Sequence, residues 1–370
     1  MMQFIDLKTQ YAKIKKGVDA RILNVLEHGK YIMGPEVKEL ENELSSYTST
    51  DFCISCSSGT DALLMPLMAW DIGPGDAVFT TPFTFISTAE VIQLLGATPV
   101  FVDIDPVTYN LDPEHLEDVI NKIISEGKLN PKAVIPVDLF GLPADYERIA
   151  AIAAKFELYV IEDAAQSFGG SIKDSKAGSF GHVASTSFFP AKPLGCYGDG
   201  GAIFTNDQVL KDKLESIRIH GKGTDKYNNI RIGLNARFDT IQAAVLLEKL
   251  SIFDEEITLR QKVSAAYTEK LKNKVVTPFI PDGYRSAWAQ YSVQADSSEH
   301  RQEIMSRLNA NGVPTAVYYP LPLHLQEAFK HLGYSDGEFP VTEQISQKIF
   351  SLPMHPYLDL ESIDKITNWV

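Results

Sequence analysis

Lys192 is the residue of this sequence with the clearest potential for covalent chemistry. It lies in the apolar segment 186–195, where Phe188, Phe189 and Leu194 surround it and a proline on either side restricts the backbone. Apolar neighbours disfavour the charged ammonium and lower the pKa of the amine, as a lysine that forms a Schiff base requires. Alternatively, the lysine stem lies over an apolar surface and its head stays in water. The segment alone leaves both interpretations open.

Small and polar residues at 57–61 form a second segment with chemical potential. They follow a predicted strand over 52–56 and precede a predicted helix from Ala62 to about Trp70. A helix N-terminus reached through such a turn presents free backbone N–H groups and the positive end of the helix dipole, and both favour a phosphate. Ser, Thr and Asp are equally common as ordinary N-caps, so the turn is a weak signal by itself.

Asp163 directly follows an apolar strand predicted over 159–162. A carboxylate in that position is costly to bury unless it meets a cation. One such cation is the protonated ring nitrogen of pyridoxal 5′-phosphate (PLP), whose ring then acts as an electron sink. A helix N-cap is the simpler explanation for an isolated aspartate. A phosphate turn, a strand-end carboxylate and a desolvated lysine in one α/β unit are together the three parts that a PLP enzyme needs.

The elements around these residues predict a largely parallel α/β sheet covered on both faces. Apolar strands are expected within 96–103 and at 52–56, 77–80, 133–136, 159–162 and 202–205, alternating with helices. Asp103, Asp138 and Asp163 all lie near the carboxyl ends of these strands, where ligands gather in such sheets. The second half predicts helices at 240–255, 257–272, 299–310 and 340–350, with strands at 289–294 and 314–318. We therefore expect a large domain over 1–250 and a small α+β domain over 251–370.

Composition excludes several classes of partner. The chain has 370 residues and a formal charge of −14, which argues against nucleic acid and anionic membranes as partners. It lacks a signal peptide and an apolar stretch of ~20 residues, so we expect a cytoplasmic protein. Cys53 and Cys56 form a C-x-x-C, but with three cysteines and no nearby histidine pair, a buried strand is the better interpretation than a metal site.

Eight segments together resemble the DegT/DnrJ/EryC1/StrS family of sugar aminotransferases, which are fold type I PLP enzymes like aspartate aminotransferase. They are residues 4–7, 34–37, 58–63, 84–89, 162–167, 187–192, 198–202 and 235–237. The resemblance implies that Lys192 holds PLP as a Schiff base and moves the proton between substrate and cofactor. It implies that Asp163 pairs with the pyridine nitrogen, that Gln166 lies near the ring hydroxyl, and that Phe85 stacks on the ring.

Further roles also follow only from the resemblance. Gly59, Thr60, Asp61 and Ser187 would hold the cofactor phosphate, joined by Asn235 from a second subunit, which implies a homodimer with shared active sites. Relatives with histidine in place of the lysine are dehydratases, so the lysine indicates transamination. L-Glutamate would donate the amino group, converting PLP to its amine form, PMP.

Residues 53–56, 187–201 and 351–357 carry a more specific likeness, to family members that aminate C3 of UDP-2-acetamido-2-deoxy-3-oxo-glucuronate, on a route to a 2,3-diamino uronic acid of surface polysaccharide such as O-antigen. Arg237 would grip the sugar carboxylate, with Tyr318 and Tyr319 as hydroxyl donors, although these relatives are expected to have histidine at position 318. An ion pair with Asp239 is the rival interpretation of Arg237. The remaining alternatives are an aminotransferase for a 4-keto-6-deoxy nucleotide sugar and a PLP-binding regulator without turnover.

Overall fold

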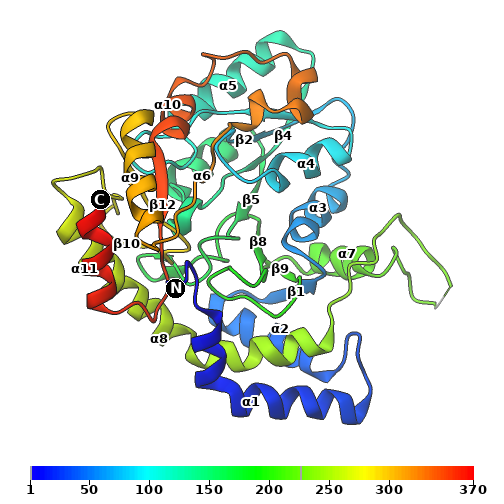
Figure 1. Cartoon of the computed structure of the whole chain (residues 1–370). Helices are drawn as coiled ribbons and strands as arrows, with labels where there is room; N and C mark the ends of the chain where they lie inside the picture. The colour runs from blue at the N-terminus through cyan, green and yellow to red at the C-terminus, as the bar shows by residue number, and fades with distance from the viewer. Residues whose placement is uncertain (1, 226) are drawn as a thin grey trace.

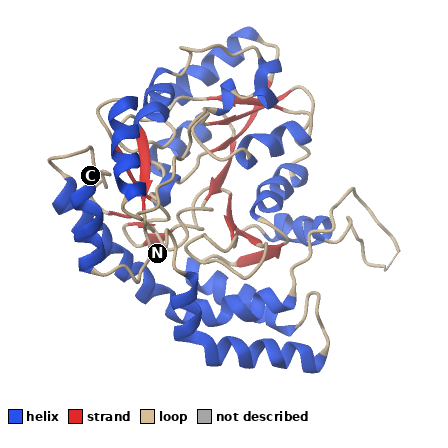
Figure 2. Cartoon of the chain, in the orientation of Figure 1, coloured by secondary structure: helices blue, strands red, loops and turns tan. Residues whose placement is uncertain are grey.

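The computed structural model of the chain describes residues 2–225 and 227–370. A mixed seven-stranded sheet forms its centre (Figures 1 and 2). Across the sheet the strands are β1 (Phe52–Cys56), β9 (Gly201–Thr205), β8 (Val183–Ser187), β5 (Tyr159–Asp163), β4 (Asn130–Ile135), β2 (Asp76–Thr80) and β3 (Thr98–Phe101). β9 pairs antiparallel with both of its neighbours, while the strands from β8 to β3 are parallel. The predicted α/β class is confirmed.

Helices cover both faces of this sheet because its strands are apolar on both sides. One face packs against α3 (Gly59–Ala69), α4 (Ser87–Leu94) and α7 (Gln208–Arg218). The other packs against α2 (Pro35–Thr48), α5 (Pro113–Glu126), α6 (Tyr146–Lys155) and the first half of α8 (Thr240–Leu271), while α1 (Leu7–His28) lies outside α8. None of the described helices is long and apolar enough to cross a membrane.

α8 is one continuous helix, so the predicted break near residue 256 is wrong. The polar run at 254–256 indicated a boundary, but the segment 240–271 contains no glycine or proline to end the helix. Glu256 is buried, and its carboxylate accepts two hydrogen bonds from the side chain of Gln10, at 3.1 and 2.9 Å. Because α8 runs across residue 250, it links the two expected domains, and the division there stays a prediction.

The C-terminal part is a small α+β unit. Its strands β11 (Tyr291–Gln294) and β12 (Ile349–Leu352) pair antiparallel, and α9 (Ser298–Ala310) and α11 (Leu360–Trp369) pack against them. α10 (Pro340–Lys348) leads directly into β12 and packs through Ile345 in a separate apolar cluster. The strand predicted at 314–318 is wrong, since only Ala316 makes a single bridge, to Ser351. A second small sheet joins β6 (Ser171–Ile172), β7 (Ser175–Lys176) and β10 (Tyr284–Arg285).

The segment between α7 and α8 projects from the body of the molecule (Figure 1). An antiparallel bridge between Lys222 and Asn229 gives it a hairpin shape. Ile230 and Ile232 are 57% and 85% exposed on its return arm. Apolar side chains held away from the core in this way are typical of a surface that meets another protein.

Candidate active site

Lys192 lies in the loop between β8 and β9, at the end of the sheet where β5 also ends. Phe188 and Leu194 are buried on either side of it, whereas Phe189, which was also expected to cover the amine, is 51% exposed in the single chain. Burial lowers the pKa of the Lys192 amine, and the charge of Asp163 partly opposes that shift. The lysine and the strand-end aspartate are therefore close enough for their charges to interact.

Asp163 ends β5 and is almost completely buried. Its Oδ2 accepts a hydrogen bond from Thr88 Oγ1 at 2.9 Å, and its Oδ1 accepts one from the Ala165 backbone N–H at 3.2 Å. Burial raises the pKa of the carboxyl, while the Thr88 bond and the charge of Lys192 lower it. No helix begins here, so the N-cap interpretation is wrong, and the acid instead pairs electrostatically with a lysine.

Gln166 follows Asp163 in the turn after β5, and its amide is fixed from both ends. The Phe140 backbone N–H donates to Gln166 Oε1 at 2.8 Å, and Gln166 Nε2 donates to the Tyr319 hydroxyl at 3.3 Å. Tyr319 is buried enough that desolvation and the nearby Asp163 raise the pKa of its hydroxyl. The hydroxyl therefore stays protonated at neutral pH and keeps a proton available as a donor.

The turn at 57–61 lies against the same end of the sheet, and glycine is required for its close approach. A Cβ on Gly59 would come within 2.6 Å of Ser187 Cβ, and one on Gly201 within 2.4 Å of the Ser58 carbonyl oxygen. Ser58 caps α3 by accepting from the Asp61 N–H at 3.0 Å, so the N-cap interpretation of the turn also holds. The N-terminus of α3 and the Ser187 hydroxyl form a cradle that fits a phosphate.

Asn235 and Arg237 line an open hollow of about 400 Å³ together with Ser57, Gly198, Asp199 and Asp239. The Arg237 Nε donates to Asn235 Oδ1 at 2.8 Å. Arg237 and Asp239 form no ion pair in the described chain, so the rival interpretation of Arg237 is not supported. This leaves an exposed guanidinium in a hollow that Ser57, the first residue of the phosphate turn, also lines.

Three partners of these residues were not predicted from the sequence. Thr88 bonds Asp163, Phe140 orients Gln166, and Ser87 shares a hydrogen bond with Thr60 at 2.8 Å. Ser87 and Thr88 lie just after Phe85, in a segment that the family resemblance includes. Nothing local marks Phe140, because only its backbone N–H is used.

The other two strand-end aspartates do not reach the site. Asp138 is buried and accepts hydrogen bonds from Ala144 N and Tyr146 OH, both at 2.8 Å, and from Ser167 Oγ at 2.5 Å. Asp103 bonds to the start of α10. All three aspartates lie near the carboxyl ends of strands, as predicted, but backbone and hydroxyl donors occupy the carboxylates of Asp103 and Asp138.

Side chains of the kinds that bind metals do not gather in the described chain. No three of its His, Cys, Asp and Glu side chains lie together as a metal site requires. Cys53 and Cys56 are buried in β1, as the strand prediction had it.

Known proteins share this fold and sequence over nearly the whole chain. UDP-2-acetamido-2-deoxy-3-oxo-D-glucuronate aminotransferase of Pseudomonas aeruginosa is 52% identical over 364 residues, covering 98% of each chain. The crystal structure of a DegT DnrJ EryC1 StrS aminotransferase from Brucella abortus superposes with a TM-score of 0.97 at 54% identity, covering 100% of this chain and 98% of that one. NtdA from Bacillus subtilis, solved with bound cofactor PMP, gives a TM-score of 0.89 at 30% identity, covering 99% and 82%.

These likenesses confirm the resemblance and the fold predicted from it. The description of the matching family is "DegT/DnrJ/EryC1/StrS aminotransferase family", and its profile matches residues 12–370. With a site of the expected composition inside a match of that length, the chain belongs to the DegT/DnrJ/EryC1/StrS aminotransferase family.

Proposed function

We propose that the chain is a PLP-dependent aminotransferase of nucleotide sugars. The observation that carries the proposal is the buried Asp163 carboxylate, whose charge interacts with the Lys192 amine at the end of the sheet where the turn at 57–61 packs closely against Ser187. When bound, PLP supplies an electron sink for a carbanion next to the substrate nitrogen. The lysine is the point of covalent attachment and, when released, the base that moves a proton at the substrate carbon.

The remaining residues bind and orient. Asp163 would hold a proton on the ring nitrogen, and its low exposure would strengthen that interaction. Gln166 would bind the ring hydroxyl through its amide, and Phe85, which is 56% exposed, would be available to stack on the ring. Thr60, Asp61 and Ser187 surround the cofactor phosphate at the start of α3, and Asn235 completes that set from a second subunit.

We propose that the amino donor is L-glutamate and the acceptor UDP-2-acetamido-2-deoxy-3-oxo-glucuronate, aminated at C3. The name of the Pseudomonas aeruginosa relative supports this substrate. Arg237 has no acidic partner in the described chain and is free to pair with a carboxylate. Tyr318 and Tyr319 contribute hydroxyls to the sugar wall. The product is then a precursor of a diamino uronic acid for surface polysaccharide, made in the cytoplasm.

A homodimer is part of the proposal. The exposed isoleucines of the projecting hairpin and the open hollow at Asn235 and Arg237 both suit a second copy of this chain. Each subunit would then complete the active site of the other. Light scattering should give twice the mass of the 41.0 kDa chain.

Lys192→Ala tests the cofactor assignment. The purified variant should lack the absorption band at ~400 nm that a covalently bound PLP chromophore gives, and should not transfer nitrogen from glutamate. Lys128→Ala removes an exposed lysine and should keep both the absorption band and the transfer of nitrogen from glutamate. A Lys192→Ala spectrum identical to that of the unaltered protein would overturn the assignment.

The wild-type protein tests the substrate assignment. It should convert the 3-oxo-glucuronate nucleotide in the presence of glutamate and leave a 4-keto-6-deoxy nucleotide sugar unreacted. The opposite preference would replace the proposed substrate with that alternative. Cofactor binding without turnover of either sugar would favour a regulator.

A further inference from the structure

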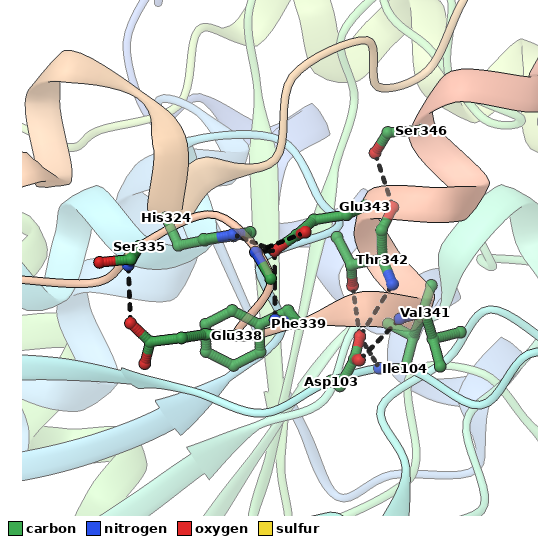
Figure 3. Close-up of polar contacts among 11 residues, drawn as sticks. Asp103, Ile104, His324, Ser335, Glu338, Phe339, Val341, Thr342, Glu343 and Ser346 are labelled. Carbon is green, nitrogen blue, oxygen red and sulfur yellow. Dashed lines mark hydrogen bonds and ion pairs between the residues drawn. The ribbon is translucent and has the colours of Figure 1, made fainter. Parts of the chain in front are cut away.

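The carboxylate of Asp103 joins the end of the large sheet to the C-terminal unit. It follows β3, and it contacts the start of α10, some 240 residues later (Figure 3). Oδ2 accepts from the Val341 backbone N–H at 3.0 Å. Oδ1 accepts from the Thr342 N–H at 3.0 Å, from Thr342 Oγ1 at 2.7 Å and from the Ile104 N–H at 2.9 Å. The two carboxylate oxygens thus accept four hydrogen bonds in all.

This carboxylate serves as the N-cap that α10 lacks. Phe339 occupies the N-cap position and has no side-chain oxygen, and Pro340 at the first position has no N–H. The next two N–H groups, of Val341 and Thr342, are the donors that an N-cap side chain normally satisfies. Asp103 satisfies them from another part of the chain, and its negative charge also meets the positive end of the helix dipole.

The position of Asp103 relative to the sheet is fixed. Its backbone N–H donates to His115 Nδ1 at 2.8 Å, and its carbonyl oxygen accepts from the Asp112 N–H at 3.1 Å. The side chain is only 6% exposed, so water competes little for its oxygens. A change at the carboxylate is therefore transmitted to α10 and not absorbed by movement of the sheet.

α10 in turn supports one wall of the active site. Ile345 in α10 and Ile349 after it pack in one apolar cluster with Phe83, Tyr318 and Tyr319. The Tyr319 hydroxyl accepts a hydrogen bond from Gln166, the residue assigned to the cofactor ring. The position of α10 therefore determines the positions of the Tyr318 and Tyr319 side chains.

A second connection runs from the first turn of α10 to the segment that bears Phe85. Glu343 accepts from His324 Nε2 at 3.0 Å and from the Phe339 N–H at 3.2 Å, as Figure 3 shows. Next to His324, the Leu323 N–H donates to the Pro82 carbonyl at 2.9 Å. Pro82 lies three residues before Phe85, so the same helix start also reaches the other side of the site.

We propose that Asp103 is a positioning residue of the transamination: by capping α10 it holds Tyr318 and Tyr319 in place, the latter bonded to Gln166, and sets the wall on which the nucleotide sugar binds. This inference rests on the proposed function. The wall is shared by both half-reactions, but the bulky sugar contacts more of it than glutamate does. Loss of the cap therefore impairs the sugar half-reaction more than the glutamate half-reaction.

Two variants remove the interaction in different ways. Asp103→Asn keeps the shape of the side chain but removes its charge and places an amide NH2 against one of the N–H groups of α10. Thr342→Val keeps the shape of the threonine and removes only the bond from Oγ1, which provides a second test where the first variant does not fold. Asp359→Ala is the matched control, because Asp359 caps α11 through the Ser362 N–H at 2.8 Å, in the same unit but outside these contacts.

Kinetics should separate positioning from stability. In Asp103→Asn, kcat/KM for the sugar should fall by about tenfold to a hundredfold, since small misplacements of positioning groups cost rates of this order. The glutamate half-reaction, followed by the cofactor absorbance, should change by less than about threefold. In a Tyr319→Phe background the effect of Asp103→Asn on the sugar should largely vanish. Equal losses in both half-reactions, or full additivity with Tyr319→Phe, would overturn the inference.

Hydrogen exchange tests the same inference without turnover. Peptides over residues 313–323 should exchange faster in Asp103→Asn and in Thr342→Val than in the unaltered protein, and Asp359→Ala should leave them unchanged. If exchange there is unaltered in both variants, Asp103 does not hold this wall. Should the unaltered protein fail to convert the sugar, the proposed function falls, while the exchange result still decides whether Asp103 positions the tyrosines.

Discussion

At the scale of single residues, the site depends on how strongly the fold favours the charged form of Asp163. Burial raises the pKa of this carboxyl, and the hydrogen bond from Thr88 Oγ1 is the first of the interactions that lower it. A hydrogen bond to a charged group contributes roughly 1.5–3 kcal/mol. Thr88 therefore makes the largest single contribution that favours the ionised form of Asp163.

Thr88→Val should reveal this effect through the pH dependence of the rate. Valine keeps the shape of the side chain but cannot donate, so the pKa of Asp163 should rise and less of its anion should exist at a given acid pH. The acid limb of the kcat profile should move up by about one pH unit, with kcat at neutral pH reduced by about tenfold or less. Thr258→Val changes an exposed threonine of α8 and serves as control. If the acid limb of the kcat profile does not move, Thr88 does not determine the pKa of Asp163.

At the scale of elements, α8 fixes the loop that carries Lys192. Lys249 of α8 is buried, and its Nζ donates to the Gly195 carbonyl at 2.6 Å and lies 4.4 Å from the ring centre of Tyr197. Gln242, two turns earlier on the same helix, accepts from the Tyr197 N–H at 2.8 Å. The helix thus holds the backbone three to five residues after Lys192.

Lys249→Met should lower activity with little change in stability. Methionine fills a similar volume, and losing a buried charge offsets the loss of its bond, because burial already lowers the pKa of Lys249 to about 8. We expect kcat to fall by about tenfold to a hundredfold, since a loosened loop misplaces the Lys192 amine. The melting temperature should shift by only a few degrees at most. Lys262 is exposed on the same helix, so Lys262→Met should leave kcat and the melting temperature unchanged. A normal kcat in Lys249→Met would contradict this role of α8.

The elements of the first 205 residues could be predicted well, because apolar strands alternate there with amphipathic helices and Gly-Pro turns separate them. The weakly apolar strand β8, Val-Ala-Ser-Thr-Ser, has no such pattern and was not recognised as a strand. Lys192 and Asp163 were found because local composition marks them. Their supports, such as Thr88 and Lys249, come from segments far away in sequence, and no local pattern shows which distant hydroxyl or amine will meet them.

At the scale of the whole molecule, the two ends of the chain meet at His355. The Met354 N–H donates to the Phe4 carbonyl at 3.1 Å, and Arg260 of α8 donates to the Met354 carbonyl at 3.4 Å. His355 is 5% exposed, and its Nδ1 has no hydrogen-bond partner in the described chain. Burial, with a smaller effect of the Arg260 charge, lowers the pKa of the imidazole to about 4, although Asp6 opposes the shift.

This buried imidazole should make the protein lose stability in mild acid. The unfolded chain binds a proton at His355 below about pH 6.5, while the folded chain does so only near pH 4, so protons favour unfolding between these values. The difference of about 2.5 pKa units corresponds to about 3 kcal/mol of unfolding free energy, lost progressively as the pH falls from 6.5 to 4. Urea unfolding at a series of pH values should show a shallower loss for His355→Gln than for the unaltered protein. His331→Gln, which alters an exposed histidine, should follow the unaltered protein. Parallel curves for His355→Gln and the unaltered chain would mean that the acid sensitivity of the fold arises elsewhere, in its many carboxylates.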